Sequence, residues 1–223
     1  WTISVDWQYI YSVLPQFYVA TMLTLKISLI GIGFSLILGL ICSVIITYKI
    51  FILDKIVKIY VEISRNTPLL IQLFFLYYGL PKIGIKLDGI TCGIIGLTFL
   101  GGSYMAEAFR AGLQSVAKGQ IDAARSVGLN VIQVFRYVIF SQALSLSIPA
   151  LGANCLFLMK ESSVLSAIAV VELLFVTKDL MGMDYKTTEA LFLLIVSYLI
   201  ILLPVSMLTS YLEYRSRRVS HGT

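Results

Sequence analysis

The sequence predicts an all-α, polytopic membrane protein with about five transmembrane helices. The chain has 223 residues, of which 58% are hydrophobic and only 13% are charged, whereas soluble domains carry about 25% charged residues. A bilayer core of about 30 Å needs roughly 20 apolar helical residues. The long uncharged stretches are residues 27–48, 66–81, 89–106, 137–159 and 190–212. We therefore expect one transmembrane domain over residues 1–223.

The alternative is a soluble protein with buried core helices, which the low charge content disfavours. Cys42, Cys92 and Cys155 all lie within hydrophobic stretches. No pair has metal-ligand spacing, so we expect small apolar side chains and no metal site. Residues 1–16 hold no basic cluster, so we expect no cleavable signal peptide there.

The basic residues indicate the orientation. With the N-terminus outside and five spans, eleven Lys and Arg residues fall on the inner side and four on the outer side. Positive charge in short loops favours the cytoplasmic side. We expect an outside N-terminus and a cytoplasmic C-terminus, and the same bias accounts for the net charge of +5 without a nucleic-acid partner.

The first span is expected over residues 17–48, after an outer segment with aromatic interface anchors. Small residues recur along this span at four-residue spacing, which predicts close approach of a second helix. The anchors are Trp1, Trp7, Tyr9 and Tyr11, and the small residues are Gly31, Ser35, Gly39, Ser43 and Thr47.

The next elements are an interfacial helix over residues 49–65 and a second span that begins at Asn66-Thr67-Pro68, where proline suits the first helical turn. A short loop, 82–88, leads to the third span at 89–110. Near its end, Glu107 and Arg110 are three residues apart and can pair on one face.

The fourth span begins at about residue 142 and contains Pro149, which is expected to bend it. Residues 162–171 are too short to cross and predict a partly buried helix on the outer side. Residues 172–189 form the longest expected outer loop. The fifth span, 190–213, is followed by basic anchors on the inner side, namely Arg215, Arg217 and Arg218.

Between the third and fourth spans lies a polar insert, residues 111–141. We expect a short helix over 119–128, with Asp122 near its positive end and Gly128 in the left-handed conformation that ends a helix. A second amphipathic helix follows, because Val131, Val134, Phe135 and Val138 recur at helical spacing. The candidate residues for docking a soluble partner are Gly119, Gln120, Asp122, Ala123, Ala124, Arg125 and Gly128.

This insert resembles the hallmark of the permease subunits of bacterial ABC importers, Glu-Ala-Ala, three residues, Gly, nine residues, then Ile, any residue and Leu-Pro. The chain has Asp122-Ala123-Ala124, then Gly128, then Val138 to Ser141 at the same spacing. Asp replaces Glu, and Ser141 replaces Pro. Four further blocks are similar to the polar amino acid subgroup (histidine, glutamine or arginine type). They are Arg65 to Leu73, Tyr104 to Glu107, Ser141 to Leu144, and Lys160 to Ser163.

The resemblance implies a type I ABC importer permease fold, in the bacterial inner membrane, that imports a polar amino acid by alternating access. It implies docking of residues 111–141 as the coupling-helix segment on a cytoplasmic ABC ATPase dimer, which binds ATP-Mg. It further implies a second permease subunit, in a homodimer or heterodimer, and a periplasmic or surface solute-binding protein. The chain lacks a Gly-Lys-Ser/Thr phosphate loop, so we expect no cofactor in it and a non-catalytic subunit.

Candidate substrate or gate residues follow from the cost of polar groups inside a membrane. Adjacent Lys160 and Glu161 can hold a zwitterion or form a gate, although one of them can also pair elsewhere. Glu107 is as well explained by a structural pair with Arg110. Tyr104 and Asn154 lie at suitable depth, and both are equally consistent with hydrogen bonds between helices.

Two other functions remain as alternatives, a channel-like pore subunit and an intramembrane enzyme. A channel needs a selectivity filter or a ring of like charges, and the sequence shows no obvious one. The enzyme lacks the His-Glu-x-x-His and Gly-x-Ser-x-Gly patterns, and the sole histidine, His221, lies in the tail.

Overall fold

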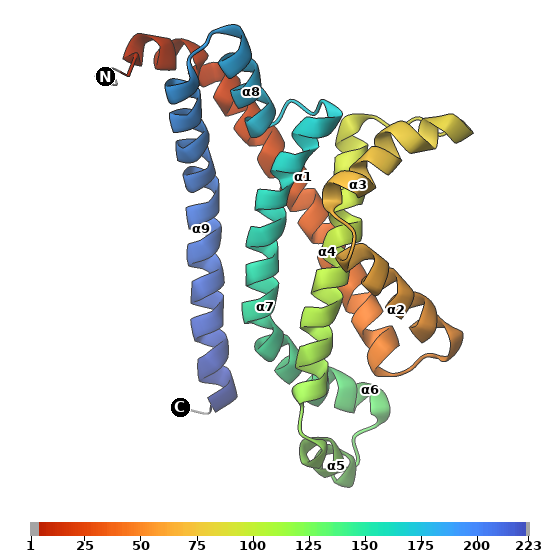
Figure 1. Ribbon diagram of the computed structural model, residues 1–223. Helices are drawn as coiled ribbons and strands as arrows, with labels where there is room; N and C mark the ends of the chain where they lie inside the picture. The colour runs from red at the N-terminus through yellow and green to blue at the C-terminus, as the bar shows by residue number, and fades with distance from the viewer. Residues whose placement is uncertain (1–4, 222–223) are drawn as a thin grey trace. The chain divides into compact units, whose positions relative to one another are not determined.

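The computed structural model describes the backbone of residues 5–221 and the side chains of residues 5–216 (Figure 1). Trp1 and the side chains of Arg217, Arg218 and His221 lie outside the described residues. The described part is helical and contains no strand. Its elements are α1 (Trp7–Thr47), α2 (Phe51–Arg65), α3 (Leu69–Phe74), η1 (Phe75–Gly79), η2 (Leu80–Ile83), α4 (Gly89–Ser115), α5 (Lys118–Ser126), α6 (Val131–Gln133), η3 (Val134–Ile139), α7 (Phe140–Glu161), η4 (Ser162–Ile168), α8 (Leu173–Met183) and α9 (Thr187–His221).

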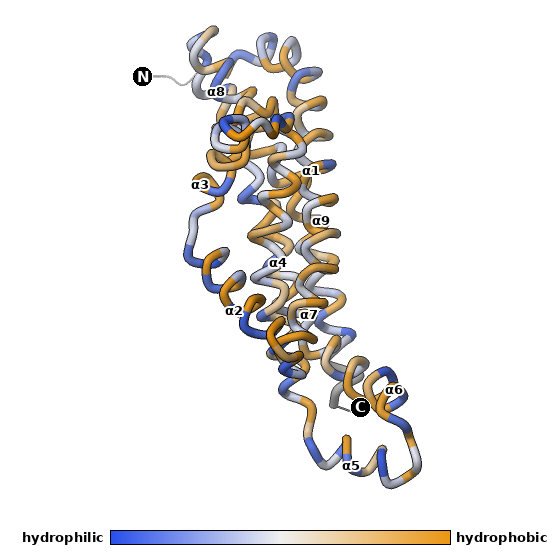
Figure 2. Tube along the Cα trace, turned by 90° about the vertical axis from the view of Figure 1, so that its right-hand side faces the viewer, coloured by the Kyte–Doolittle hydropathy of each residue, from blue (hydrophilic) through white to orange (hydrophobic). Residues whose placement is uncertain are grey.

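Four of the described helices are long and apolar enough to cross a membrane, and a fifth apolar helical stretch, Leu69–Ile83, is shorter. The hydropathy colouring of Figure 2 shows long hydrophobic tracts along α1 and α9, whereas hydrophobic and hydrophilic stretches alternate on α2. The prediction of about five apolar helices is confirmed. The first helix starts at Trp7 rather than at residue 17, because the segment before the uncharged stretch continues the same helix.

Residues 172–189 are not the loop that the sequence predicted, because they contain α8. The side chain of Glu172 caps this helix by accepting hydrogen bonds from the backbone N–H groups of Leu174 at 2.9 Å and Phe175 at 2.8 Å. Free N–H groups at a helix start require such partners. Glutamate is not among the preferred capping residues, which is why the signal was missed.

Contacts within the structure divide the chain into two compact units. Unit 1 comprises Trp1–Ile32, Thr67–Thr98 and Leu156–Val205, and unit 2 comprises Gly33–Asn66, Phe99–Cys155 and Ser206–Thr223. Each unit is described by itself below.

Unit 1 is packed through small residues. A Cβ atom at Gly31 would lie 2.9 Å from the Cβ of Leu97, and one at Gly96 would lie 2.8 Å from a methyl carbon of Leu73. Both distances are shorter than van der Waals contact. The Cβ of Leu97 is fixed by the backbone, so α1 approaches α4 this closely because residue 31 is glycine, whereas the methyl group of Leu73 would have to shift to admit a side chain at residue 96. On the same unit, Asp6 forms an ion pair with Lys186 at 2.8 Å, and the hydrogen bond from this lysine lowers the pKa of the Asp6 carboxyl.

In unit 2, a glycine again permits close packing of α1 against α4. A Cβ atom at Gly39 would lie 2.8 Å from the backbone nitrogen of Ala106. The small-residue pattern of the first span therefore serves helix packing, as predicted. Helix α2 is tied to α4 because the hydroxyls of Tyr60 and Ser64 both donate to the carbonyl of Phe99, at 2.7 and 2.9 Å.

Candidate functional site

The polar insert in unit 2 folds as helix α5, a glycine turn and helix α6, as predicted. Gly128 has φ +86°, in the left-handed region that favours glycine. Its N–H donates to the carbonyl of Arg125 at 3.0 Å, and the N–H of Leu129 donates to the carbonyl of Ala124 at 3.2 Å. The turn thereby satisfies carbonyls that a helix end leaves without partners.

The second helix of the insert starts with a reciprocal capping box that the sequence analysis overlooked. The Asn130 side chain accepts from the backbone N–H of Gln133, and the Gln133 side chain accepts from the backbone N–H of Asn130, both at 2.9 Å. An Asn followed three residues later by Gln is a readable signal of this motif. The box fixes the point at which the chain leaves the glycine turn.

Helix α6 does not end before the fourth span. It continues through the π-helical turn η3 into α7, so that helical backbone runs from Val131 to Glu161. The helix that contains the fourth span therefore starts at Val131 rather than near residue 142. Ser141 lies in the first turn of α7, where the helix continues without the proline of the family pattern.

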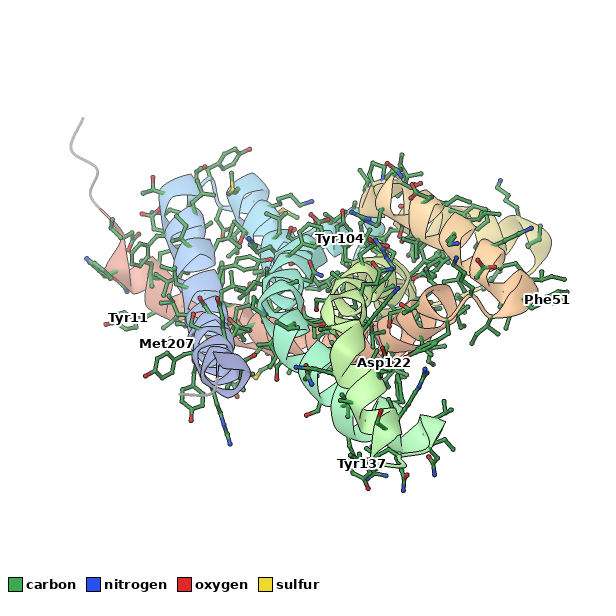
Figure 3. All side chains as sticks on the ribbon, turned by 90° about the horizontal axis from the view of Figure 1, so that it is seen from below. Tyr11, Phe51, Tyr104, Asp122, Tyr137 and Met207 are labelled. Atoms are coloured by element: carbon green, nitrogen blue, oxygen red, sulfur yellow. The ribbon has the colours of Figure 1, made fainter. Side chains whose placement is uncertain are left out.

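The docking candidates differ in exposure. Gly119, Gln120, Asp122, Ala123, Arg125 and Gly128 are exposed, whereas Ala124 is buried against its own unit. Asp122 is not near the start of the helix, because α5 begins at Lys118 and has no acidic residue in its first turn. The expected interaction with the helix dipole is therefore wrong. Figure 3 shows Asp122 on this segment together with Tyr137.

Three large apolar side chains on the same segment are exposed, which sequence reasoning missed. Val127, Val131 and Ile132 are 78%, 75% and 76% exposed. They flank the glycine turn on both sides. Exposed apolar side chains gathered in one place mark an interaction surface more often than isolated ones do.

A polar cluster in unit 2 joins the ends of α2 and α4. Glu107 binds Arg110 through both carboxylate oxygens, at 2.6 and 3.2 Å, which confirms the predicted pair. Arg65, which the sequence analysis did not select, lies 3.8 Å from the same carboxylate. Its guanidinium also lies 5.4 Å from the ring centroid of Tyr104. Two cations around one carboxylate leave the cluster with a net positive charge.

Asn154 joins the neighbourhood of Tyr104. Its amide donates to the backbone carbonyl of Tyr104 at 3.2 Å, a hydrogen bond between α7 and α4. The structure thus brings Tyr104, Glu107 and Asn154 together in unit 2. Lys160 and Glu161 belong to unit 1, where Lys160 is exposed and Glu161 is half-buried at the end of α7.

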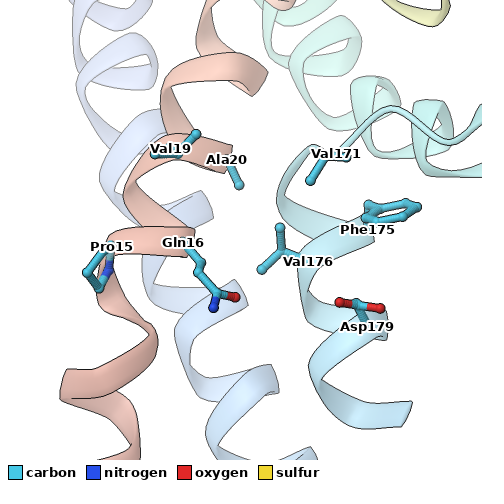
Figure 4. A pocket seen from close by; sticks show the side chains of 8 residues that line it. All are labelled: Pro15, Gln16, Val19, Ala20, Val171, Phe175, Val176 and Asp179. Atoms are coloured by element: carbon cyan, nitrogen blue, oxygen red, sulfur yellow. The ribbon is translucent and has the colours of Figure 1, made fainter. Parts of the chain in front are cut away.

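Unit 1 has a pocket of about 470 Å³ between α1 and α8. Figure 4 shows the polar ends of Gln16 and Asp179 directed into it from the two helices. The remaining lining residues are apolar. Among the residues that the structure describes, no group of three or more His, Cys, Asp or Glu side chains is arranged to hold a metal ion.

Comparison with known proteins places these features in a family. Residues 31–218 match the family described as "Binding-protein-dependent transport system inner membrane component". The chain is 34% identical over 213 residues to the probable amino-acid permease protein YxeN of Bacillus subtilis (strain 168), covering 94% of this chain and 95% of that protein. It is 36% identical over 192 residues to the probable glutamine ABC transporter permease protein GlnM of the same organism, covering 86% and 89%.

A solved structure agrees with these relatives. It is described as the crystal structure of an amino acid ABC transporter with histidines, and it superimposes with a TM-score of 0.87 at 31% identity over 96% of this chain and 100% of that chain. The order of helices, the glycine turn and the matched residues 31–218 lead to one conclusion. This chain belongs to the family of inner membrane components of binding-protein-dependent transport systems.

Proposed function

We propose that this chain is the permease subunit of an ATP-driven importer for a polar amino acid, located in a bacterial inner membrane with its N-terminus outside. A permease of this family works with an ATPase and a binding protein. The relatives named for amino acids and glutamine support the substrate class. The observation that carries the mechanism is the continuous helix from the glycine turn into the fourth span.

In this proposal, residues 111–141 form the coupling segment, and the α5–turn–α6 unit docks on a cytoplasmic ABC ATPase dimer that binds ATP-Mg. Asp122 presents a polar contact, and Ala123 leaves a backbone that a partner can approach closely. Val127 supplies apolar area that docking would remove from water. Ala124 faces inward and holds α5 on its own unit.

Closure of the ATPase dimer would displace the start of α6. The capping box keeps that start helical, and no helix end separates it from α7, so the displacement reaches the fourth span. A second permease subunit, in a homodimer or heterodimer, would move in the same way. Alternating access then results from rigid-body rotation of packed helices.

Each unit offers its own polar cluster as a candidate substrate contact. In unit 2, the net positive cluster of Arg65, Glu107 and Arg110 suits the α-carboxylate of an amino acid, with Tyr104 and Asn154 nearby. In unit 1, Lys160 and Glu161 present a second pair of opposite charges. A periplasmic or surface solute-binding protein would deliver the amino acid from the outer side.

Reconstitution tests this function. The permease is co-expressed with its cognate ATPase and incorporated into proteoliposomes, and ATP-dependent uptake of labelled glutamine, histidine and arginine is measured with loaded binding protein. We expect uptake of one or more of them only with ATP. Current or flux of equal size without nucleotide would establish a channel instead.

Two substitutions and one control separate docking on the ATPase from transport. Asp122→Ala should lower the amount of ATPase that co-purifies with the permease, whereas Asp184→Ala, at another exposed aspartate, should leave it unchanged. Lys160→Ala should weaken uptake more than it weakens ATPase co-purification. Wild-type uptake by Lys160→Ala would remove this residue from the substrate site.

A further inference from the structure

A groove in unit 2 lies where the end of α1 meets α6 and η3. It has a volume of about 300 Å³, and its walls include Val44 of α1, Tyr48 directly after α1, Ile132 of α6 and Phe135 of η3. Arg125 of α5 is its only charged lining residue. The rings of Tyr48 and Phe135 meet edge to face with centroids 6.0 Å apart, which gives the groove a rigid aromatic wall.

The groove is open to the surroundings of its unit. Tyr48 is 48% exposed and Ile132 is 76% exposed. Burial of apolar surface of this kind by an apolar ligand is favourable. Seven of its eight lining residues are apolar or aromatic and the eighth is Arg125, a lining that suits a ligand with an apolar tail and an anionic head.

Arg125 gives the lining of the groove a positive charge. Within the described part of the chain, Arg125 takes part in none of the ion pairs, and the nearby carboxylate of Asp122 does not bind it. Lys49 directly follows Tyr48 and adds a second positive charge at this end of α1. A ligand with an anionic head would therefore be attracted here.

The position along α1 identifies the kind of ligand. Val44 and Tyr48 end the uncharged stretch 27–48, and Lys49 begins the polar turn. A transmembrane helix changes in this way where hydrocarbon gives way to lipid headgroups. Basic pockets between helices at this depth bind anionic headgroups, and a guanidinium can bind phosphate through two hydrogen bonds.

We propose that this groove binds an anionic glycerophospholipid, with its phosphate on Arg125 and one acyl chain along Tyr48, Phe135 and Ile132. The site does not depend on the transported substrate. A lipid bound there links the end of α1 to the α5–α6 segment, and so holds the segment at a defined depth in the membrane surface.

The test measures lipid retention rather than transport. The permease–ATPase complex is delipidated in mild detergent and examined by native mass spectrometry after addition of phosphatidylglycerol or phosphatidylcholine with identical acyl chains. We expect the complex to retain at least about fivefold more phosphatidylglycerol than phosphatidylcholine, because a single charge-assisted hydrogen bond provides a preference of this size. Arg125→Gln should reduce that retention to the phosphatidylcholine level.

Arg136→Gln is the matched control, because Arg136 is an exposed arginine on η3 that does not line the groove. It should retain phosphatidylglycerol as the wild type does. Equal retention of the two lipids by the wild type, or unchanged retention by Arg125→Gln, would overturn the proposal. Retention that occurs only without the ATPase would show that the ATPase occupies the groove, and would overturn it as well.

A second measurement does not depend on the folding of a variant. A phosphatidylglycerol analogue with a photoreactive group on one acyl chain is added to the wild-type complex, irradiated and located by peptide mass spectrometry. Labelling on the peptides that contain Tyr48 and Ile132, competed by phosphatidylglycerol and not by phosphatidylcholine, supports the site. Labelling elsewhere contradicts it.

Discussion

Replacement of Gly128 by alanine perturbs the glycine turn without a steric clash. The backbone of Gly128 has φ +86°, and a Cβ atom built on it meets no other atom within 4 Å. The cost is therefore conformational. A left-handed backbone costs an L-residue about 1–2 kcal/mol, which lowers the population of the native turn roughly 5- to 30-fold relative to competing turn conformations.

This cost acts on the segment that is proposed to meet the ATPase. When the turn changes, the hydrogen bonds from Gly128 to Arg125 and from Leu129 to Ala124 are lost, and α5 leaves its position beside α6. The helices of the spans are unaffected, because Gly128 is exposed and contacts none of them. We expect the Gly128→Ala permease to insert and dimerise normally. The ATPase activity of its complex with the ATPase subunits should no longer respond to loaded binding protein.

The assay is ATP hydrolysis in proteoliposomes with and without loaded binding protein, at equal amounts of assembled complex. Gly128→Asn should fall between wild type and alanine, since asparagine tolerates the left-handed region better. Gly182→Ala is the control, because that glycine lies in α8 with no atom within 4 Å of its Cβ position and no positive φ. Wild-type stimulation in Gly128→Ala would refute the reasoning. So would an equal loss in Gly182→Ala.

Three further predictions concern stability. Gly39→Ala should lower the melting temperature, because overpacking a tight contact costs about 1–3 kcal/mol. Gly33→Ala on the same helix should leave it unchanged, because a Cβ atom there meets no atom within 4 Å. Equal melting temperatures of the two variants would contradict this prediction. Asn130→Ala should cost about 1 kcal/mol of helix stability by removing the cap, seen as faster amide exchange at the start of α6, and unchanged exchange would refute it. Burial raises the pKa of Glu172, a residue between the spans, to about 7, so the folded state binds a proton more tightly than the unfolded state. The free energy of unfolding should therefore fall by about 3 kcal/mol as pH rises from about 4.5 to about 7, and Glu172→Gln should flatten that pH dependence; a slope that persists in the variant would show that another group is responsible.

Several features were predictable because they depend on neighbours in the sequence. The apolar stretches determine where helices cross, since each backbone polar group inside a membrane must be satisfied within its own helix. The glycine turn at Gly128 and the pair of Glu107 with Arg110 are likewise local, as both involve residues a few positions apart. The capping box at Asn130 belongs to the same class and was readable, although it was overlooked.

Tertiary structure decided the features that join distant residues. Arg65 reaches Glu107, and Asn154 reaches Tyr104, only because α2 and α7 pack on α4 in unit 2. Ala124 is buried and Ala123 is exposed, although the two residues are identical and adjacent in the sequence. Helix α8 forms in a segment that composition alone marks as a loop, because Glu172 caps it from a buried position. The physical reason is the same in each case: local pattern sets which helices form, whereas contacts between helices set which side chains meet.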